Sequence, residues 1–306
     1  MVSVKITEGE ADFGVPSAGK KCKTWYRIYG DIESGVRPLI ALHGGPGVGH
    51  NYLESLADLT GKYNIPVIIY DQLGTANSTH LREKHGDTSF WTLELFLKEL
   101  DNLLKHLGID SSYDLYGNSW GGMLGAEHAV LQPKGLHRLI IADSPASMVT
   151  WVEEANRLRK QLPQDVQEAL QKHEDDGTTE SKEYEAAVEV FYAKHVCRID
   201  PMPKEVLDIF ENIKVDPTVY HTMNGPSEFF VIGSLKSWDI TDRLKNIQAP
   251  TLLINGYYDE ATNLVSEPYF REIPHIKWFT FAESSHMPHW EERDRFMELV
   301  SGFLEY

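Results

Sequence analysis

The chain has 306 residues, of which 42% are apolar and 25% are charged, an ordinary composition for a globular protein. Its 46 acidic residues outnumber its 29 basic ones and give a net charge of −17. Nucleic acids and anionic membranes both require a basic footprint, so neither is the expected partner. We interpret most of the acidic excess as a solvated surface that keeps the protein soluble.

Cysteine usage and the start of the chain favour a cytoplasmic protein. Cys22 and Cys197 are too few for a disulfide framework and stand in no metal-binding spacing, so we expect free thiols. Residues 1–8 lack the basic start and apolar run of a signal peptide. No stretch approaches the roughly 18 apolar residues of a membrane span. The histidines are scattered and no HExxH occurs, so no metal or cofactor is predicted.

Short apolar runs that end in glycine, serine or aspartate recur along the chain. An imperfectly alternating segment at 22–29, before them, predicts an antiparallel edge strand. Continuous apolar runs without alternation suit strands that are buried on both faces of a parallel sheet. These runs cover residues 37–43, 66–71, 113–117, 139–143, 251–255 and 276–281.

Amphipathic helices are predicted between the strands. Leucines recur at helical spacing over 92–107, with Gly108 as the stop, and apolar residues share one face over 291–304. Strands that alternate with helices require right-handed crossovers. The predicted fold class is therefore α/β, a mostly parallel doubly wound sheet.

The pattern changes between residues 144 and 238. Strand-like runs vanish there, and charged helical stretches take over at 152–161, 164–173 and 184–195. The strand at 251–255 then resumes the α/β pattern. We interpret 144–238 as a helical cap, inserted between two parts of one core at 1–143 and 239–306.

Residues 117–121, Gly-Asn-Ser-Trp-Gly, fit the G-x-S-x-G pattern of a nucleophile elbow. They follow an apolar strand and precede a helix-like stretch at 123–131. A turn this tight needs glycines, because bulky side chains two positions from Ser119 would collide. It would leave the serine hydroxyl exposed beside the N–H groups of a helix start. A plain turn between a strand and a helix is the alternative.

A serine nucleophile needs a base, and the base needs an acid that orients it. In this fold the acid follows a later strand and the histidine follows the last one. Asp259 and His286 stand in those places. We predict that His286 moves the proton of Ser119 and that Asp259 orients and stabilises the imidazole. His289 is the competing base, and Glu260 is the competing acid.

The segment His43-Gly44-Gly45-Pro46-Gly47 follows another predicted strand. An oxyanion needs backbone N–H donors, and glycines let the backbone approach closely. We predict the N–H groups of Gly45 and Trp120 as the donors, with Gly44 as the alternative donor and a substrate contact. The segment lacks the spacing of a phosphate or dinucleotide loop. His43 is interpreted as a hydrogen-bonded structural residue.

Four groups of residues together carry a family resemblance. They are HGGPG at 43–47, DQLG at 71–74, GNSWGG at 117–122, and Asp259 with His286. In this order they resemble the proline iminopeptidase family of α/β-hydrolases, which includes prolyl aminopeptidases, the tricorn-interacting aminopeptidase and fungal L-amino-acid amidases. The resemblance covers nearly the whole chain. Ala76 departs from it, because the family often has glycine there.

The resemblance implies a serine hydrolase that releases an N-terminal residue, often proline, from short peptides, amides or arylamides through an acyl-enzyme. Related enzymes hold the free amino group with two glutamates, one in a cap segment like 223–229 and one directly after the catalytic aspartate. Both positions are glutamate here, Glu228 and Glu260. A carboxylate pair suits a cationic amine. A surface charge and a solvated loop residue are their alternative interpretations.

Other functions are compatible with the same triad. They are a general carboxylesterase or lipase, a biosynthetic hydrolase or acyl-transfer enzyme acting on a peptide-like metabolite, and a silent binding protein on a hydrolase scaffold. The cap sets the choice of substrate. Aromatic candidates for the pocket wall are Trp120, Tyr220, Phe229 and Trp238.

Overall fold

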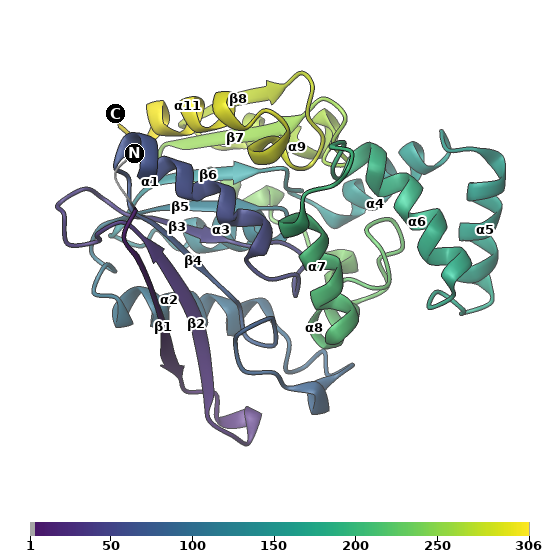
Figure 1. Cartoon of the computed structure of the whole chain (residues 1–306), viewed down its shortest axis with the longest axis horizontal. Coiled ribbons are helices and arrows are strands. Elements are labelled where there is room, and N and C mark those ends of the chain that lie inside the picture. Colours follow the sequence, from purple (N-terminus) through teal and green to yellow (C-terminus); the bar gives the residue numbers. More distant parts are fainter. Residues whose placement is uncertain (1–3, 306) are drawn as a thin grey trace.

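The computed structural model describes residues 4–305 (Figure 1). Within these residues eight strands form one sheet in the order β1-β2-β4-β3-β5-β6-β7-β8. The β1–β2 and β2–β4 pairs are antiparallel, and the other neighbours are parallel. The mostly parallel α/β sheet is confirmed. The strands are β1 (Ile6–Phe13), β2 (Cys22–Tyr29), β3 (Leu39–Leu42), β4 (Val67–Tyr70), β5 (Tyr113–Asn118), β6 (Leu136–Ala142), β7 (Thr251–Gly256) and β8 (Ile276–Phe281).

Helices cover both faces of the sheet, because successive strand residues are apolar on both sides. In β3, Leu39 and Ala41 belong to one core cluster, and Ile40 and Leu42 belong to the other. The first cluster is completed by α1 (Ala57–Tyr63) and α11 (Arg293–Leu304). The second is completed by α2 (Leu93–His106), α3 (Trp120–Val130) and α9 (Asn263–Glu272). Shorter helices connect these elements: η1 (Pro16–Ala18), η2 (Asn51–Leu56), η3 (Arg82–Lys84), η4 (Ser234–Ser237), η5 (Thr241–Asn246) and α10 (Pro288–Glu291).

The sequence predicted most of these elements correctly. The helix expected over 92–107 is α2, and the Thr92 side chain caps it by accepting a hydrogen bond from the Leu95 N–H. The edge-strand prediction for 22–29 is wrong in one respect. β2 is antiparallel, but β1 pairs with its outer side and forms the edge. Most residues in the first half of β1 are exposed, so no apolar pattern marked it.

Five α-helices lie between β6 and β7, in the region predicted as a cap. They are α4 (Met148–Arg159), α5 (Gln164–Asp175), α6 (Lys182–His195), α7 (Lys204–Val215) and α8 (Thr218–Met223). α5 and α6 lie furthest from the sheet (Figure 1) and share a small apolar core with α4. α7 packs on η2, which follows β3. The cap therefore reaches back over the carboxyl ends of the strands, while the boundaries at 143 and 238 stay a prediction.

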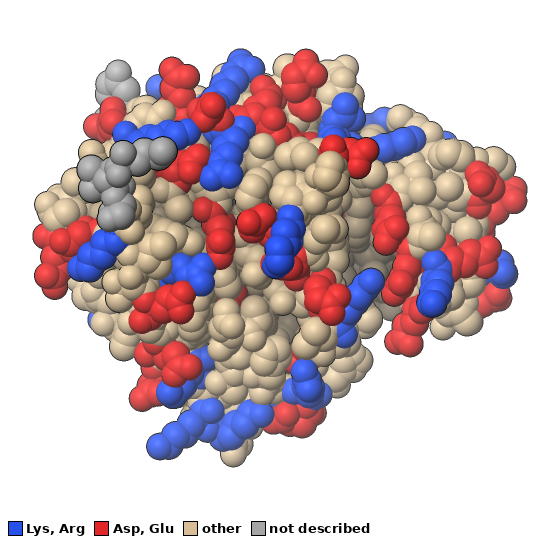
Figure 2. All heavy atoms as spheres, viewed as in Figure 1, with Lys and Arg blue, Asp and Glu red and all other residues tan. Residues whose placement is uncertain are grey.

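Charged side chains are spread over the surface. Figure 2 shows Asp and Glu distributed across the visible face, with Lys and Arg between them. This distribution agrees with the interpretation of the acidic excess as solvation. Across residues 4–305, every helix is too short or too polar to cross a bilayer. The prediction that residues 1–8 form no signal peptide includes residues 1–3, which lie outside the described residues.

Candidate active site

Ser119 lies in a strained turn between β5 and α3. Its backbone has φ 56° and ψ −124°, a region that residues other than glycine rarely adopt. A β-carbon at Gly117 would collide with the carbonyl oxygen of Gly121, and one at Gly121 would collide with that of Leu42. The two glycines are therefore needed for close backbone approach, as the elbow pattern predicts.

His286 and Asp259 lie together at the carboxyl end of the sheet. Nδ1 of His286 is 2.7 Å from Oδ1 of Asp259, and both side chains are buried. Burial lowers the pKa of His286, but the charge and hydrogen bond of Asp259, with Glu228 and Glu291 nearby, raise that pKa above its usual value. The pair has the contact that an oriented general base requires.

The competing base and acid have different surroundings. His289 is fully buried, and burial lowers its pKa to about 3, so its ring is neutral. It does not line the cavity that contains Ser119 and His286. Asp259 makes the hydrogen bond to His286, whereas Glu260 faces that cavity. The geometry favours His286 and Asp259 over His289 and Glu260.

A small cavity at the carboxyl ends of the strands brings six of the predicted residues together. Ser119, Gly44, Gly45, Glu228, Glu260 and His286 all line it. Its other walls come mainly from η2, α6, α7 and α8, and comprise Val48, Tyr52, Asn118, Tyr192, Val196, Ile209, Phe210, Ile213, Tyr220 and Met287. The cap therefore supplies much of the cavity wall.

Of the four aromatic wall candidates, Tyr220 lines this cavity. The other three are engaged elsewhere. The Trp120 indole donates to Gln72 Oε1 at 2.8 Å, the Trp238 indole donates to Glu127 Oε1 at 2.9 Å, and Phe229 packs on Phe191 with ring centroids 5.0 Å apart.

Sequence reasoning missed Tyr192 on α6 and Phe210 on α7, which line the cavity and stack on each other at 5.4 Å between centroids. Both belong to helical apolar faces. Helical periodicity predicts that such residues are buried, but it does not distinguish residues of the core from residues that line a cavity.

The two alternative oxyanion donors differ in their hydrogen bonds. The Gly44 N–H donates to the Tyr52 hydroxyl at 2.8 Å. The Gly45 N–H has no acceptor among residues 4–305. The Trp120 N–H opens α3, ahead of the first bond within that helix. The free N–H groups of Gly45 and Trp120 therefore suit the predicted role better than that of Gly44.

His43 and Gln72 hold the glycine loop against the elbow. Nδ1 of His43 donates to the Gly44 carbonyl at 2.9 Å, and Nε2 accepts from the Gln72 N–H at 3.0 Å. Burial lowers the pKa of His43 to about 4, so the ring is neutral and both nitrogens are occupied. The Gln72 side chain also contacts the His43 carbonyl, besides the Trp120 indole. Gln72, in the motif at 71–74, thus connects the glycine motif at 43–47 to the nucleophile motif at 117–122.

Glu228 and Glu260 form an acidic wall of the cavity. Glu228 accepts a 2.6 Å hydrogen bond from the Tyr220 hydroxyl, while Oε2 of the buried Glu260 has no partner within residues 4–305. Burial raises the pKa of both carboxyl groups, and the charges of Glu228 and Asp259 raise that of Glu260 further. None of the residues that line the cavity is lysine or arginine. A bound cation would stabilise the charged forms of these two buried carboxyl groups.

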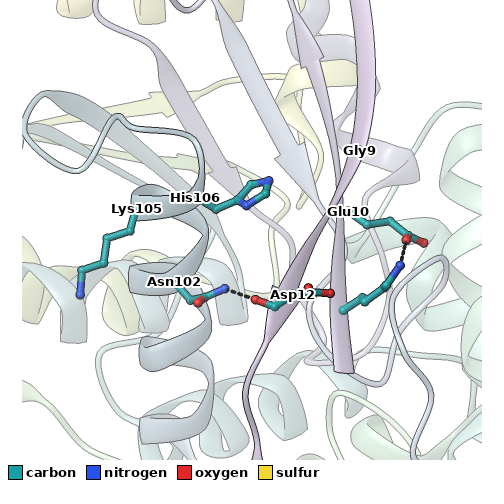
Figure 3. Close-up of a pocket in the computed structure, with 7 residues that line it drawn as sticks. Gly9, Glu10, Asp12, Asn102, Lys105 and His106 are labelled. Carbon is teal, nitrogen blue, oxygen red and sulfur yellow. Dashed lines mark hydrogen bonds and ion pairs between the residues drawn. The ribbon is translucent and has the colours of Figure 1, made fainter. Parts of the chain in front are cut away.

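An open hollow lies elsewhere, between the β1–β2 ribbon and α2 (Figure 3). Two pairs of its polar groups bond to each other: Lys23 bonds Glu10 at 2.5 Å, and the Asn102 amide donates to the Asp12 carbonyl at 2.9 Å. It contains none of the predicted site residues. Across residues 4–305, no cluster of three His, Cys, Asp or Glu side chains could hold a metal ion.

Comparison with known proteins identifies the family to which the chain belongs. The sequence model of the family described as "alpha/beta hydrolase fold" matches residues 37–293. A proline iminopeptidase of Saccharolobus solfataricus is 36% identical over 99% of this chain and 94% of its own length. The crystal structure of a proline iminopeptidase of Mycobacterium smegmatis is 42% identical over 98% of both chains, with a TM-score of 0.88.

A further solved structure, that of VinJ, is 48% identical over 98% of both chains and has a TM-score of 0.93. These similarities extend over nearly the whole chain, including the helices between β6 and β7. They confirm the resemblance that the four motifs predicted. The chain therefore belongs to the proline iminopeptidase family of α/β-hydrolases.

Proposed function

We propose that this protein is a serine aminopeptidase that releases an N-terminal residue, preferably proline, from short peptides, amides or arylamides. One observation carries the proposal: a single cavity holds Ser119, His286 and the two carboxyl groups of Glu228 and Glu260, with no lysine or arginine among its lining residues. The relatives that bear the name proline iminopeptidase support proline as the first residue.

The proposed reaction begins when Oγ of Ser119 attacks the carbonyl carbon of the first residue, while His286 takes the hydroxyl proton. The N–H groups of Gly45 and Trp120 stabilise the oxyanion that forms. The C–N bond then breaks, and His286 gives its proton to the leaving amine. A water molecule, deprotonated by His286, attacks the acyl-enzyme; the ester bond to Oγ of Ser119 breaks, His286 returns the proton to Oγ, and the free amino acid is released. Asp259 stabilises the imidazolium in both halves.

Glu228 and Glu260 are the proposed binding site for the substrate's free α-amino group. An ammonium ion between them would compensate two carboxyl groups whose charge burial disfavours, and it would add charge-assisted hydrogen bonds. A longer chain ahead of the cleaved bond would leave these carboxyl groups without a cation. A cytoplasmic location, with Cys22 and Cys197 as buried free thiols, is part of the same proposal.

The test compares three substrates: a proline arylamide with a free amino group, the same arylamide with a blocked amino group, and a short acyl ester. We expect turnover of the first and little of the second. Ser119→Ala should lower kcat/KM on the free arylamide at least about 1000-fold, with an unchanged thermal unfolding midpoint. Retained activity in that variant would rule out Ser119 as nucleophile. Turnover of the ester alone would favour a carboxylesterase.

A further inference from the structure

A second buried carboxyl group lies near the acid of the proposed triad. Asp143 follows β6 and Asp259 follows β7, and these strands are parallel neighbours. Both side chains are at most 2% exposed, and burial, together with the proximity of the Asp259 carboxyl group, raises the pKa of Asp143. Asp143 also has φ 51°, so the backbone adopts a rarely occupied conformation at this position.

Each of the two carboxyl groups has one oxygen in use and one without a partner. Oδ1 of Asp259 contacts His286 and accepts from the Ala261 N–H, while its Oδ2 has no partner within residues 4–305. Oδ2 of Asp143 accepts from the Asn118 amide at 3.1 Å, and its Oδ1 is equally unpartnered within that range. If both carboxyl groups were ionised, these two buried and unpartnered groups would repel each other.

The neighbouring hydrogen bonds fix which atom of Asn118 faces Asp143. The Tyr52 hydroxyl accepts from the Gly44 N–H, so its own proton goes to Oδ1 of Asn118, 2.8 Å away. The amide of Asn118 must then present Nδ2, a donor, to Asp143. That contact uses Oδ2 of Asp143 as an acceptor. Oδ1 of Asp143 can therefore form a hydrogen bond with Asp259 only if it carries a proton.

We propose that Asp143 is a positioning residue of the triad: its carboxyl group stays protonated and donates from Oδ1 to Oδ2 of Asp259. The proposal rests on the proposed function, in which Asp259 orients His286. The shared proton completes a hydrogen-bond chain that runs from the glycine loop through Tyr52, Asn118 and Asp143 to Asp259. Both oxygens of Asp259 then have a hydrogen-bond partner, and the plane of its carboxyl group is held for His286.

The ionisable groups around Asp143 support this protonation state. Burial and the charges of Asp259 and Glu291 raise the pKa of Asp143 well above its usual value. The other facing groups are the phenols of Tyr52 and Tyr116, whose pKa values burial also raises, so they are neutral. His286 faces the pair through Asp259 and is also near Glu228, Glu291 and His289.

The experiment compares Asp143→Asn with Asp143→Leu. The asparagine can accept from Asn118 and donate to Asp259, so it reproduces the protonated acid. We expect its kcat/KM on the free proline arylamide to stay within about threefold of the parent protein. The leucine cannot donate, and we expect kcat to fall about 10- to 100-fold with a smaller change in KM. Equal losses in the two variants would overturn the proposal.

The pH profile tests the charge of Asp143 directly. If Asp143 is protonated, Asp143→Asn removes no charge, and the acidic limb of the kcat/KM profile, set by His286, stays in place. If Asp143 were ionised, the same substitution would remove an anion near His286 and move that limb to lower pH. A shift of that kind contradicts the proposal, while an unmoved limb supports it.

An infrared difference spectrum of the parent protein against Asp143→Asn gives a reading that does not depend on activity or on the leucine variant. We expect the C=O stretch of one protonated carboxyl group, present in the parent and lost in the variant. Its absence would overturn the proposal. If Ser119→Ala retained activity while this band was present, the proposed function would fail, but the shared proton would stand.

Discussion

The hydroxyl group of Tyr220 on α8 donates a 2.6 Å hydrogen bond to Oε1 of Glu228, the cap carboxyl group that lines the Ser119 cavity. The Trp151 indole also donates to the Glu228 carbonyl at 2.8 Å, so both backbone and side chain are held. Glu228 is therefore oriented before any substrate arrives. A preorganised carboxyl group loses less conformational entropy when it binds an amine.

The first prediction concerns that carboxyl group. Glu228→Gln keeps its shape but removes its charge, so a charge-assisted bond to the substrate's amine becomes a neutral one. A loss of roughly 1.5–3 kcal/mol corresponds to about a 10- to 100-fold lower kcat/KM on free-amine arylamides, expressed mainly in KM. N-blocked substrates should be little affected. Tyr220→Phe, which removes only the orienting bond, is the matched control and should cost less than Glu228→Gln.

Steady-state kinetics on paired free and blocked arylamides make this measurement. An equal loss on both substrate types would show that Glu228 supports the fold of the cap and does not recognise the amine.

The second prediction follows from the raised pKa values of Glu228 and Glu260. A carboxyl group whose pKa is raised takes up its proton at a higher pH than an ordinary glutamate, and a protonated carboxyl group attracts no ammonium. KM for a free-amine substrate should therefore rise as the pH falls, already above the usual titration range of glutamate. It should rise again at alkaline pH, where the substrate's amine, with a pKa of about 8, loses its proton.

KM measured from pH 5 to pH 10 tests this behaviour, with Glu228→Gln as the comparison. The acidic rise should be weaker in the variant, because one of the two titrating groups is gone. A KM that does not change with pH in the parent protein would argue against ionic recognition of the amine.

Local patterns were enough to predict the catalytic elements of the site. Gly117 could be assigned from sequence because its β-carbon would collide with Gly121 in the same turn, whereas the collision of Gly121 with Leu42 of β3 depends on the fold. Asp259 and His286 could be assigned because their order after the last strands follows from the fold, and the structure brings them together. Their catalytic roles stay a prediction until the variants are measured.

Contacts between distant segments could not be predicted in the same way. Tyr192 and Phe210 line the cavity only because α6 and α7 pack beside each other over the sheet. From sequence, Asp143 is predicted only as the end of a buried strand. Its neighbours along the chain do not indicate that it lies near Asn118 and Asp259. Such partners depend on strand order, which one sequence does not show.

The third prediction concerns Ala76, the departure from the family pattern. Ala76 has φ 44°, where a β-carbon is unfavourable, and the same loop is held by the Asn77 N–H bond to Asp71 at 3.0 Å. Ala76→Gly should therefore stabilise the protein by about 0.5–1 kcal/mol in urea unfolding. Ala186→Gly is the matched control. It changes an exposed residue inside α6 and should destabilise by about 1 kcal/mol. If both variants lost stability alike, Ala76 would carry no backbone strain.

The last prediction concerns the buried ion pair of His50 and Asp71. Nδ1 of His50 is 2.8 Å from Oδ1 of Asp71, and Glu54 lies 3.6 Å from Nε2. Burial lowers the pKa of His50, but the charge and hydrogen bond of Asp71, together with Glu54, raise it to about 9 from an ordinary value of 6.5. Because the folded pKa is raised, the stabilisation is fully present below pH 6.5 and is lost as the pH rises through about 9.

The difference in unfolding free energy between the parent protein and His50→Gln should therefore be largest near pH 6. It should shrink by roughly 3 kcal/mol towards pH 10. Comparison at each pH cancels the titration of groups that the two proteins share. In an Asp71→Asn background most of this pH dependence should vanish, because the main source of the raised pKa is gone. A difference that stays constant from pH 6 to pH 10 in the parent background would mean that His50 is neutral in the folded protein.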